Sequence, residues 1–332
     1  MFPNPTEPLV VRTLRAHRLD IMAREAGVMQ SLAQAWLDVE NSLRAEMQIL
    51  AMEAQAVGKV SAVRLAKMER YGRLLAQAEA RHQVFVDAAS VTIGDYQTEL
   101  ARRGLDHAVE ATRAVYIGGG QIGPVFDILP VDAIESLIGV TADGTPLNVY
   151  LQERYPQAVN GVTRALIDGV AMGIEPIEIA KNMMDAFGVS YKTAINMART
   201  EPLRVYRASS QMQYEASGVV RGWKRLSAHD SRVCAGCLFT EGEFYDNLHE
   251  FEEHNQGRCT PVPVVIGVNE PSWVSGGDWF VLQDEETQRS ILGDGRYQAW
   301  QDGTSLDAMV KRVSDPVWGG SFIPTPLSEI IN

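Results

Sequence analysis

The stretch LAQAWLDVENSLRAEMQIL, residues 32–50, repeats apolar side chains at intervals of three and four residues. The repeating positions are Leu32, Trp36, Val39, Leu43, Met47 and Leu50. Because an α-helix completes a turn in about 3.6 residues, these side chains line one face of a helix. Residues 56–61 interrupt the pattern, and we expect Gly58 to end this helix and Ser61 to cap the next one.

A second apolar seam follows the interruption. Its positions are Leu65, Met68, Leu75, Ala78, His82 and Phe85, and a further helical stretch covers residues 95–115. Two seams joined by a short turn predict an antiparallel helical hairpin. The hairpin either belongs to a small bundle that packs on its own chain or forms an arm that docks on a partner, since two helices alone bury little surface.

Glycine-rich residues 117–124 form the clearest break in the chain, because three consecutive glycines lose much conformational entropy when they are ordered. This segment lacks the Lys-Ser/Thr pair of a phosphate-binding loop. We therefore predict an N-terminal helical arm over residues 1–116 and a linker over 117–124. A central domain over 125–268 and a C-terminal tail with short helices over 269–332 follow.

The central and C-terminal parts alternate helical and strand patterns. We expect Ser190 to cap a helix that Pro202 ends or kinks. Strand patterns cover residues 219–226, 244–245 and 262–266, the last at a sheet edge because of Pro263. Helical patterns return over 284–292 and 305–313. The predicted fold class is α+β and predominantly helical, with a helical hairpin or bundle, a helical domain, and a small β-sheet that carries a C-x2-C knuckle.

Composition narrows the function classes. The chain has 332 residues, with 30 basic and 42 acidic side chains and a net charge of −12. Duplex nucleic acid is therefore a poor candidate for the main ligand, because phosphate binding requires a basic surface. No apolar run is long enough for a membrane span, and the first residues lack a secretory pattern. We expect a protein that stays in the cytosol where it is made and has no membrane partner.

All three cysteines, Cys234, Cys237 and Cys259, fall close together with His254. The pattern C-x2-C-x16-H-x4-C matches the thiolate and imidazole ligands that zinc binds as a tetrahedron. His249 is an alternative fourth ligand. Four protein ligands leave no open position, so we expect such a zinc site to be structural rather than catalytic. The alternative interpretation is three reduced cysteines in a small core.

Enzymatic interpretations of the same region fit less well. His249 and His254 lie five residues apart, whereas the metalloprotease helix requires a spacing of four. A zinc deaminase requires H-x-E before P-C-x-x-C, and Val233 precedes Cys234 here. Cys259 with His254 remains a candidate nucleophile and base. We interpret the acidic run at residues 250–253 as a solvated face and expect no enzymatic activity and no catalytic residue.

A series of short motifs occurs in a fixed order: Ala198-Arg199-Thr200-Glu201, Arg204, Gly222-Trp223, Asp230-Ser231-Arg232-Val233-Cys234-Ala235-Gly236-Cys237, His254, Arg258-Cys259 and Pro261-Val262. This series resembles the Mu F-like phage head-morphogenesis, or minor head (minor capsid) protein, family, over roughly residues 125–268. Residues 288–300 also resemble tails of such proteins. The family's H-P-N-C-R-C is His254–Cys259 here, with Gly257 at the first cysteine position, so a metal site requires Cys259 as its ligand.

The resemblance implies a minor structural component of a tailed-phage head. Such proteins associate with the portal protein, and with the major capsid or scaffolding protein, during capsid assembly in the host cytoplasm, and affect DNA packaging or ejection. The acidic charge fits a virion component that lies near packaged DNA without binding it tightly. The alternative is a zinc-supported enzyme or effector, nuclease or toxin-like, delivered with the particle.

The remaining motif residues receive structural interpretations. We expect Arg199, Glu201 and Arg204 to belong to one helix, with Arg199 and Glu201 anchoring it to loops. Their candidate partners are Asp230 and Arg232. Binding of a partner or a phosphate by Arg199 and Glu201 is the functional alternative. Trp223 is expected in the core of the small sheet.

Overall fold

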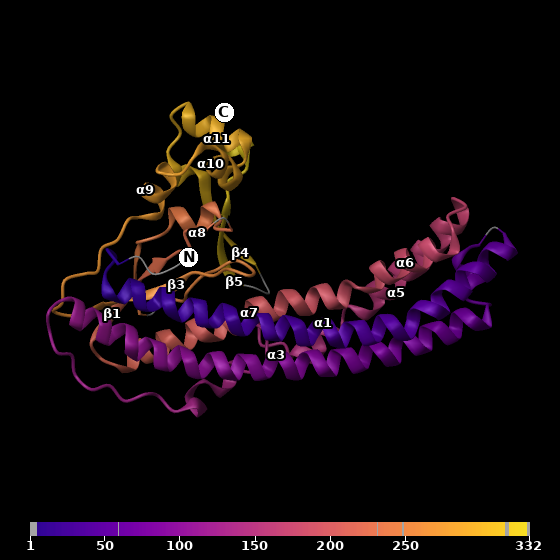
Figure 1. Cartoon of the computed structure of the whole chain (residues 1–332), viewed down its shortest axis with the longest axis horizontal. Helices are drawn as coiled ribbons and strands as arrows, with labels where there is room; N and C mark the ends of the chain where they lie inside the picture. The colour runs from indigo at the N-terminus through magenta and orange to yellow at the C-terminus, as the bar shows by residue number, and fades with distance from the viewer. Residues whose placement is uncertain (1–4, 59, 231, 248, 316–318, 331–332) are drawn as a thin grey trace. The chain divides into compact units, whose positions relative to one another are not determined.

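The computed structural model of the chain describes residues 5–58, 60–230, 232–247, 249–315 and 319–330. In chain order the helices, with 3-10 helices marked η, are α1 Leu9–Val57, α2 Ala62–Leu65, α3 Glu69–Gly118, η1 Val131–Leu137, α4 Leu147–Gln152, α5 Tyr155–Ala171, α6 Pro176–Phe187, α7 Val189–Ala216, α8 Ala235–Phe239, α9 Gly276–Val281, α10 Glu285–Leu292, α11 Asp294–Gln301, η2 Leu306–Met309 and α12 Leu327–Ile330 (Figure 1). The strands are β1 Val220–Leu226, β2 Phe244–Asp246, β3 Thr260–Val265, β4 Val310–Asp315 and β5 Gly319–Pro324. The predominantly helical α+β class is confirmed.

The chain divides into two compact units. Unit 1 contains Met1–Arg24, Gln97–Gly144 and Arg199–Asn332, and unit 2 contains Glu25–Tyr96 and Thr145–Ala198. Because α1, α3 and α7 each contribute residues to both units, neither unit is a continuous segment. The boundaries predicted at residues 116, 124 and 268 stay predictions. No helix in the described ranges combines the length and the apolar character that a membrane span requires.

Unit 2 is built around the apolar seam of α1. All six seam residues from Leu32 to Leu50 are buried. The Trp36 ring packs on Phe85 of α3, on Phe187 of α6 and on Tyr191 of α7, at centroid distances of 5.1, 5.8 and 5.6 Å. The seam is thus covered by later helices of the same chain, as expected of a bundle.

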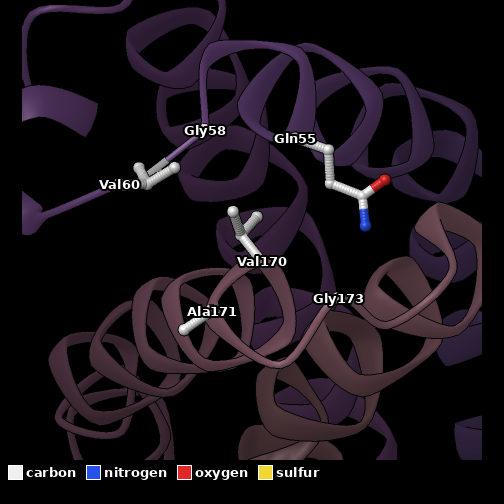
Figure 2. A pocket seen from close by; sticks show the side chains of 6 residues that line it. All are labelled: Gln55, Gly58, Val60, Val170, Ala171 and Gly173. Atoms are coloured by element: carbon white, nitrogen blue, oxygen red, sulfur yellow. The ribbon is translucent and has the colours of Figure 1, made fainter.

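The turn that closes the helical hairpin follows its sequence signals. Helix α1 ends at Val57, Gly58 adopts a φ of 85°, and Ser61 caps α2 by accepting a hydrogen bond from the Arg64 amide. Lys59 lies outside the described residues. Near this turn, Gln55, Gly58, Val60, Val170, Ala171 and Gly173 line a cavity of about 570 Å³ (Figure 2).

Unit 1 contains a three-stranded antiparallel sheet in the order β2-β1-β3. The predicted strands are confirmed, and β3, which contains Pro263, is an edge strand as expected. Trp223 is 1% exposed and lies between the Tyr245 and Phe251 rings, at centroid distances of 4.4 and 4.7 Å. Its predicted place in the sheet core is confirmed.

Unit 1 contains several apolar clusters, and two of them include the strands and the cysteines. One packs the first turns of α1 and the last turns of α3 against β1 and β3, with Val11, Ala111 and Val262 among its members. The other joins Cys237 and Cys259 to Phe280, Leu292 and Tyr297 of the C-terminal part. The C-terminal helices α9 to α11 therefore contribute to the core in which the cysteines lie.

Several local predictions were wrong. Residues 305–313 form η2 and then β4, which pairs with β5, instead of one helix. Pro202 lies inside α7 and does not end it, so of the two predicted effects only the kink stays a prediction. Ser190 lies inside the first turn of α7, and its hydroxyl hydrogen-bonds the His82 Nε2 atom at 2.7 Å instead of capping the helix. The predicted helical stretch 95–115 is confirmed as helical, but it is part of the continuous helix α3, which extends to Gly118.

Candidate metal centre

The C-x2-C motif lies at the start of α8. Cys234 is the N-cap residue, and its Sγ accepts a hydrogen bond from the Cys237 amide at 3.3 Å. A sulfur in the N-cap role satisfies one of the amides that a helix start leaves unpaired. This local geometry places both sulfurs on one side of the first turn, as the two-residue spacing predicts.

His254 comes from the loop between β2 and β3. Its Nε2 atom lies 3.1 Å from the Cys234 Sγ and 3.2 Å from the Cys237 Sγ. Its Nδ1 atom contacts the Asn255 carbonyl oxygen at 2.8 Å, and because a carbonyl only accepts, Nδ1 carries the proton. This contact fixes the ring and directs Nε2 toward the sulfurs, an arrangement typical of metal-binding histidines.

Cys259 directly precedes β3 and completes the cluster. Two overlapping groups have ligand atoms within 4.8 Å of one another: Cys234, Cys237 and His254, and Cys237, Glu253 and Cys259. The four residues predicted as ligands thus form one candidate metal-binding cluster, linked through Cys237. Three thiols and one imidazole are a donor set that suits zinc. His249, the alternative ligand, is exposed and packs on the Tyr245 ring at 5.1 Å.

Gly257, at the position where the resembled family has a cysteine, borders the Glu253 side chain. A Cβ atom at residue 257 would overlap the Glu253 carboxyl group. That carboxyl oxygen instead accepts a hydrogen bond from the Cys237 thiol at 3.0 Å. A buried carboxylate therefore occupies the space that a side chain at residue 257 would need.

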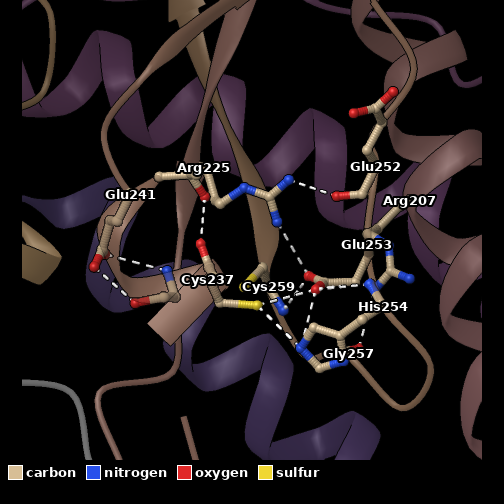
Figure 3. A network of polar contacts seen from close by, with 12 residues as sticks. Arg207, Arg225, Cys237, Glu241, Glu252, Glu253, His254, Gly257 and Cys259 are labelled. Atoms are coloured by element: carbon tan, nitrogen blue, oxygen red, sulfur yellow. Dashed lines mark hydrogen bonds and ion pairs between the residues drawn. The ribbon is translucent and has the colours of Figure 1, made fainter. Parts of the chain in front are cut away.

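Glu253 lies at the centre of a buried polar network (Figure 3). Its Oε2 atom accepts hydrogen bonds from Arg225 Nη1 at 3.2 Å and from the Cys259 amide at 3.3 Å. Arg225 also donates to the Glu252 carbonyl, and Arg207 donates to the Gly257 carbonyl at 3.2 Å. Burial alone would raise the pKa of Glu253, but Arg225 and Arg207 lower it to about 2.

The pKa shifts describe a charged Cys234–His254 pair. The hydrogen bond with Cys237 and the nearby His254 lower the pKa of Cys234 to about 5, against the effect of burial. Burial works against a charged His254, yet Cys234 and Glu253 raise its pKa to about 10. Hydrogen bonds with Cys234 and Cys259, together with burial, raise the pKa of Cys237. Metal binding here must displace protons from Cys237 and His254, because the ligating forms are thiolate and neutral imidazole.

Two acidic residues of the other motifs form ion pairs with arginines. Asp230 forms a two-pronged ion pair with Arg258, both hydrogen bonds being 2.6 Å long, and Glu201 pairs with Arg204 at 2.7 Å. Asp230 and Arg232 are thus not the partners of Glu201; Arg232 is exposed and its amide donates to Asp230. Arg199 is half-buried, and Ser231 lies outside the described residues.

Sequence reasoning missed Glu253, Arg225 and Arg207. The acidic run was interpreted as a solvated face, which is correct for exposed Glu250 and wrong for buried Glu253. One signal was present, because Arg225 lies two residues after Trp223 on β1 and so points to the same side of the strand. A charged residue on the core side of a strand requires a buried counter-charge.

No family model, no curated protein and no solved structure matches this chain significantly.

Proposed function

We propose that this protein is a minor structural component of a tailed-phage head, and that a zinc ion held by Cys234, Cys237, His254 and Cys259 stabilises unit 1. The observation that carries the proposal is the convergence of the motif series. Residues of its separate pieces, from residue 223 to residue 259, belong to the buried sheet or to the centre beside it. Pieces that are ordered in the sequence and also lie together in the fold favour the resemblance over a chance match.

The donor set supports a structural role for the zinc. Four protein ligands satisfy a tetrahedral ion and leave no position for a reacting water. Cys234 and Cys237 come from α8, whereas His254 and Cys259 come from the loop before β3. An ion bound by all four would tie these two segments together, and its binding energy would add to the stability of folding.

The proposed partners follow from the same resemblance. We expect contact with the portal protein, and with the major capsid or scaffolding protein, during assembly in the host cytoplasm. The net charge of −12 supports a location near packaged DNA without tight binding, since like charges repel. Tight duplex binding at physiological salt would contradict this part of the proposal.

Quantitative mass spectrometry of purified particles tests the structural role. Particles from the phage or prophage that encodes the chain are compared with procapsids, with portal and major capsid protein as internal standards. We expect the protein at low copy relative to the major capsid protein, and cross-linked to the portal. Its absence from both procapsids and mature particles would contradict the proposal and favour the effector alternative, with Cys259 and His254 as the first residues to mutate.

A further inference from the structure

Unit 1 contains a cleft of about 390 Å³ that the proposed function does not use. Helix α7 lines it with Glu201, Arg204, Arg207 and Gln211, which are spaced three or four residues apart, and with the neighbouring Thr200. Residues 250–253, which lead into the metal centre, also line the cleft. A concave site of this volume is large enough for a small ligand or a long side chain.

The charges that line the cleft favour a cation. Its lining includes five carboxylates, those of Asp143, Glu201, Glu250, Glu252 and Glu253, against the guanidinium groups of Arg204 and Arg207. Glu201 pairs with Arg204, and buried Arg207 lies in the field of Glu253. Two arginines outside the lining also pair with its carboxylates, Arg312 with Glu252 and Arg225 with Glu253, so five carboxylates face four guanidinium groups. An anion such as phosphate would therefore meet a net negative surface, whereas a cation would be attracted.

Glu201 supplies an acceptor that the fold leaves unused. Its side chain is fully buried, and its Oε2 atom accepts the Arg204 hydrogen bond. The Ala142 amide also faces this carboxylate, but Oε1 accepts no hydrogen bond of ordinary geometry from any of the residues that the structure describes. An unsatisfied buried carboxylate oxygen costs free energy, which a ligand N–H group would recover.

The cleft also offers an apolar surface. Leu137, Ala142 and Ala208 line it together with the polar groups. A long alkyl stem packs favourably on such a surface while its charged end reaches a carboxylate. Lysine and arginine side chains combine these two features, and a divalent metal ion does not.

We propose that this cleft binds an alkylammonium or guanidinium group, supplied by a lysine or arginine side chain of a partner polypeptide, with Glu201 as the principal acceptor. The cleft contains none of the four predicted metal ligands, although it shares Glu253 with the polar network beside them. The proposal stands whether or not the protein is a phage head component. A free polyamine carries the same group and is the other possible source.

Isothermal titration calorimetry at low ionic strength tests the site with the full chain. The probes are an N-acetylated, C-amidated pentapeptide with one central lysine in glycines, its arginine and norleucine counterparts, spermidine, and magnesium chloride. We expect the lysine and arginine peptides to bind and the norleucine peptide not to bind. Glu201→Gln removes the charge at nearly constant shape and should weaken binding about tenfold or more.

Two further variants keep the test decisive. Asp143→Asn changes an exposed carboxylate of the cleft, so it should fold normally and weaken binding about two- to threefold through the lost charge. Glu285→Gln changes an acid in α10 that pairs with Arg289 and should leave binding unchanged. Binding of spermidine alone would assign the source to a polyamine. The proposal would be overturned if the norleucine peptide bound equally well, if magnesium alone bound, or if no probe bound. It would also be overturned if Glu201→Gln and Asp143→Asn both kept full affinity.

Discussion

Replacement of Glu253 by glutamine should destabilise unit 1 strongly. The carboxylate is 3% exposed and pairs with Arg225, which is 1% exposed. The Cys237 thiol, the Cys259 amide and the His254 amide also donate to it. Glutamine keeps the shape and one acceptor oxygen but removes the charge, so the Arg225 and Arg207 guanidinium groups remain buried without compensation.

Two arguments give similar values for the loss in the free energy of unfolding that Glu253→Gln should cause. The pKa of Glu253 falls from its ordinary 4.5 to about 2, and at 1.36 kcal/mol per pKa unit this corresponds to about 3 kcal/mol of stability at neutral pH. Removal of one partner from a buried ion pair costs about 3–5 kcal/mol in other proteins. Because the folded pKa is depressed, this stability is present above about pH 4.5 and is lost as the pH falls toward 2.

Urea unfolding of zinc-free, reduced protein at pH 7 measures the effect, because zinc would convert the Cys237 thiol that donates to Glu253 into a thiolate. We expect a lower midpoint with an unchanged m-value, and a loss of about 3 kcal/mol in the free energy of unfolding. Glu285→Gln, which breaks an exposed ion pair with Arg289, serves as the matched control and should leave the midpoint unchanged. A loss below about 1 kcal/mol in Glu253→Gln would refute the reasoning, because the buried pair would then behave like a surface pair.

Three further predictions concern the metal centre, a buried histidine and a helix contact. Cys234→Ser should lower the free energy of unfolding by several kcal/mol in zinc-loaded protein, measured by urea titration, because metal binding energy is folding energy; equal stability of variant and wild type would argue against structural zinc. Burial lowers the pKa of His82 to about 4, so between pH 6.5 and 4 the unfolded chain binds a proton that the folded one does not. When the pH falls from 7 to 4, the free energy of unfolding from urea titrations should therefore drop by about 2–3 kcal/mol more in the wild type than in His82→Gln. The same pH dependence of stability in both proteins would contradict this. A Cβ atom at Gly104 of α3 would overlap the Tyr206 carbonyl of α7, so Gly104→Ala should lower the thermal midpoint. In the control Gly94→Ala the new Cβ meets no atom within 4 Å, so the free energy of unfolding should rise by about 1 kcal/mol. If Gly104→Ala also raised the stability, the close contact between Gly104 and the Tyr206 carbonyl would be contradicted.

The spacing of apolar residues was sufficient to predict the first helices of unit 2 from the sequence. The seam from Leu32 to Leu50 predicted a buried face, and Gly58 and Ser61 predicted the turn, because both signals act within one or two helical turns. The strand β4 was missed because its stability depends on pairing with β5, which is residues 319–324. A pattern within residues 305–313 does not contain that partner.

The candidate site was predicted in its ligands but not in its electrostatics. Cys234, Cys237, His254 and Cys259 could be predicted from residue type and spacing, since few other patterns bring thiols and an imidazole together. Glu250 and Glu253 belong to the same short acidic run, yet one is exposed and the other buried. The difference comes from Arg225, which lies 28 residues earlier on β1 and meets Glu253 only in the folded chain.

Metal analysis of the purified chain tests the central claim most directly. Protein prepared under reducing conditions without added chelator is examined by inductively coupled plasma mass spectrometry and by native mass spectrometry. We predict one zinc per chain in the wild type and its loss in the double variant Cys234→Ser, Cys237→Ser, with the His249→Asn variant retaining the metal. A wild-type chain that is folded, reduced and free of zinc, and that does not take up added zinc, would contradict the account.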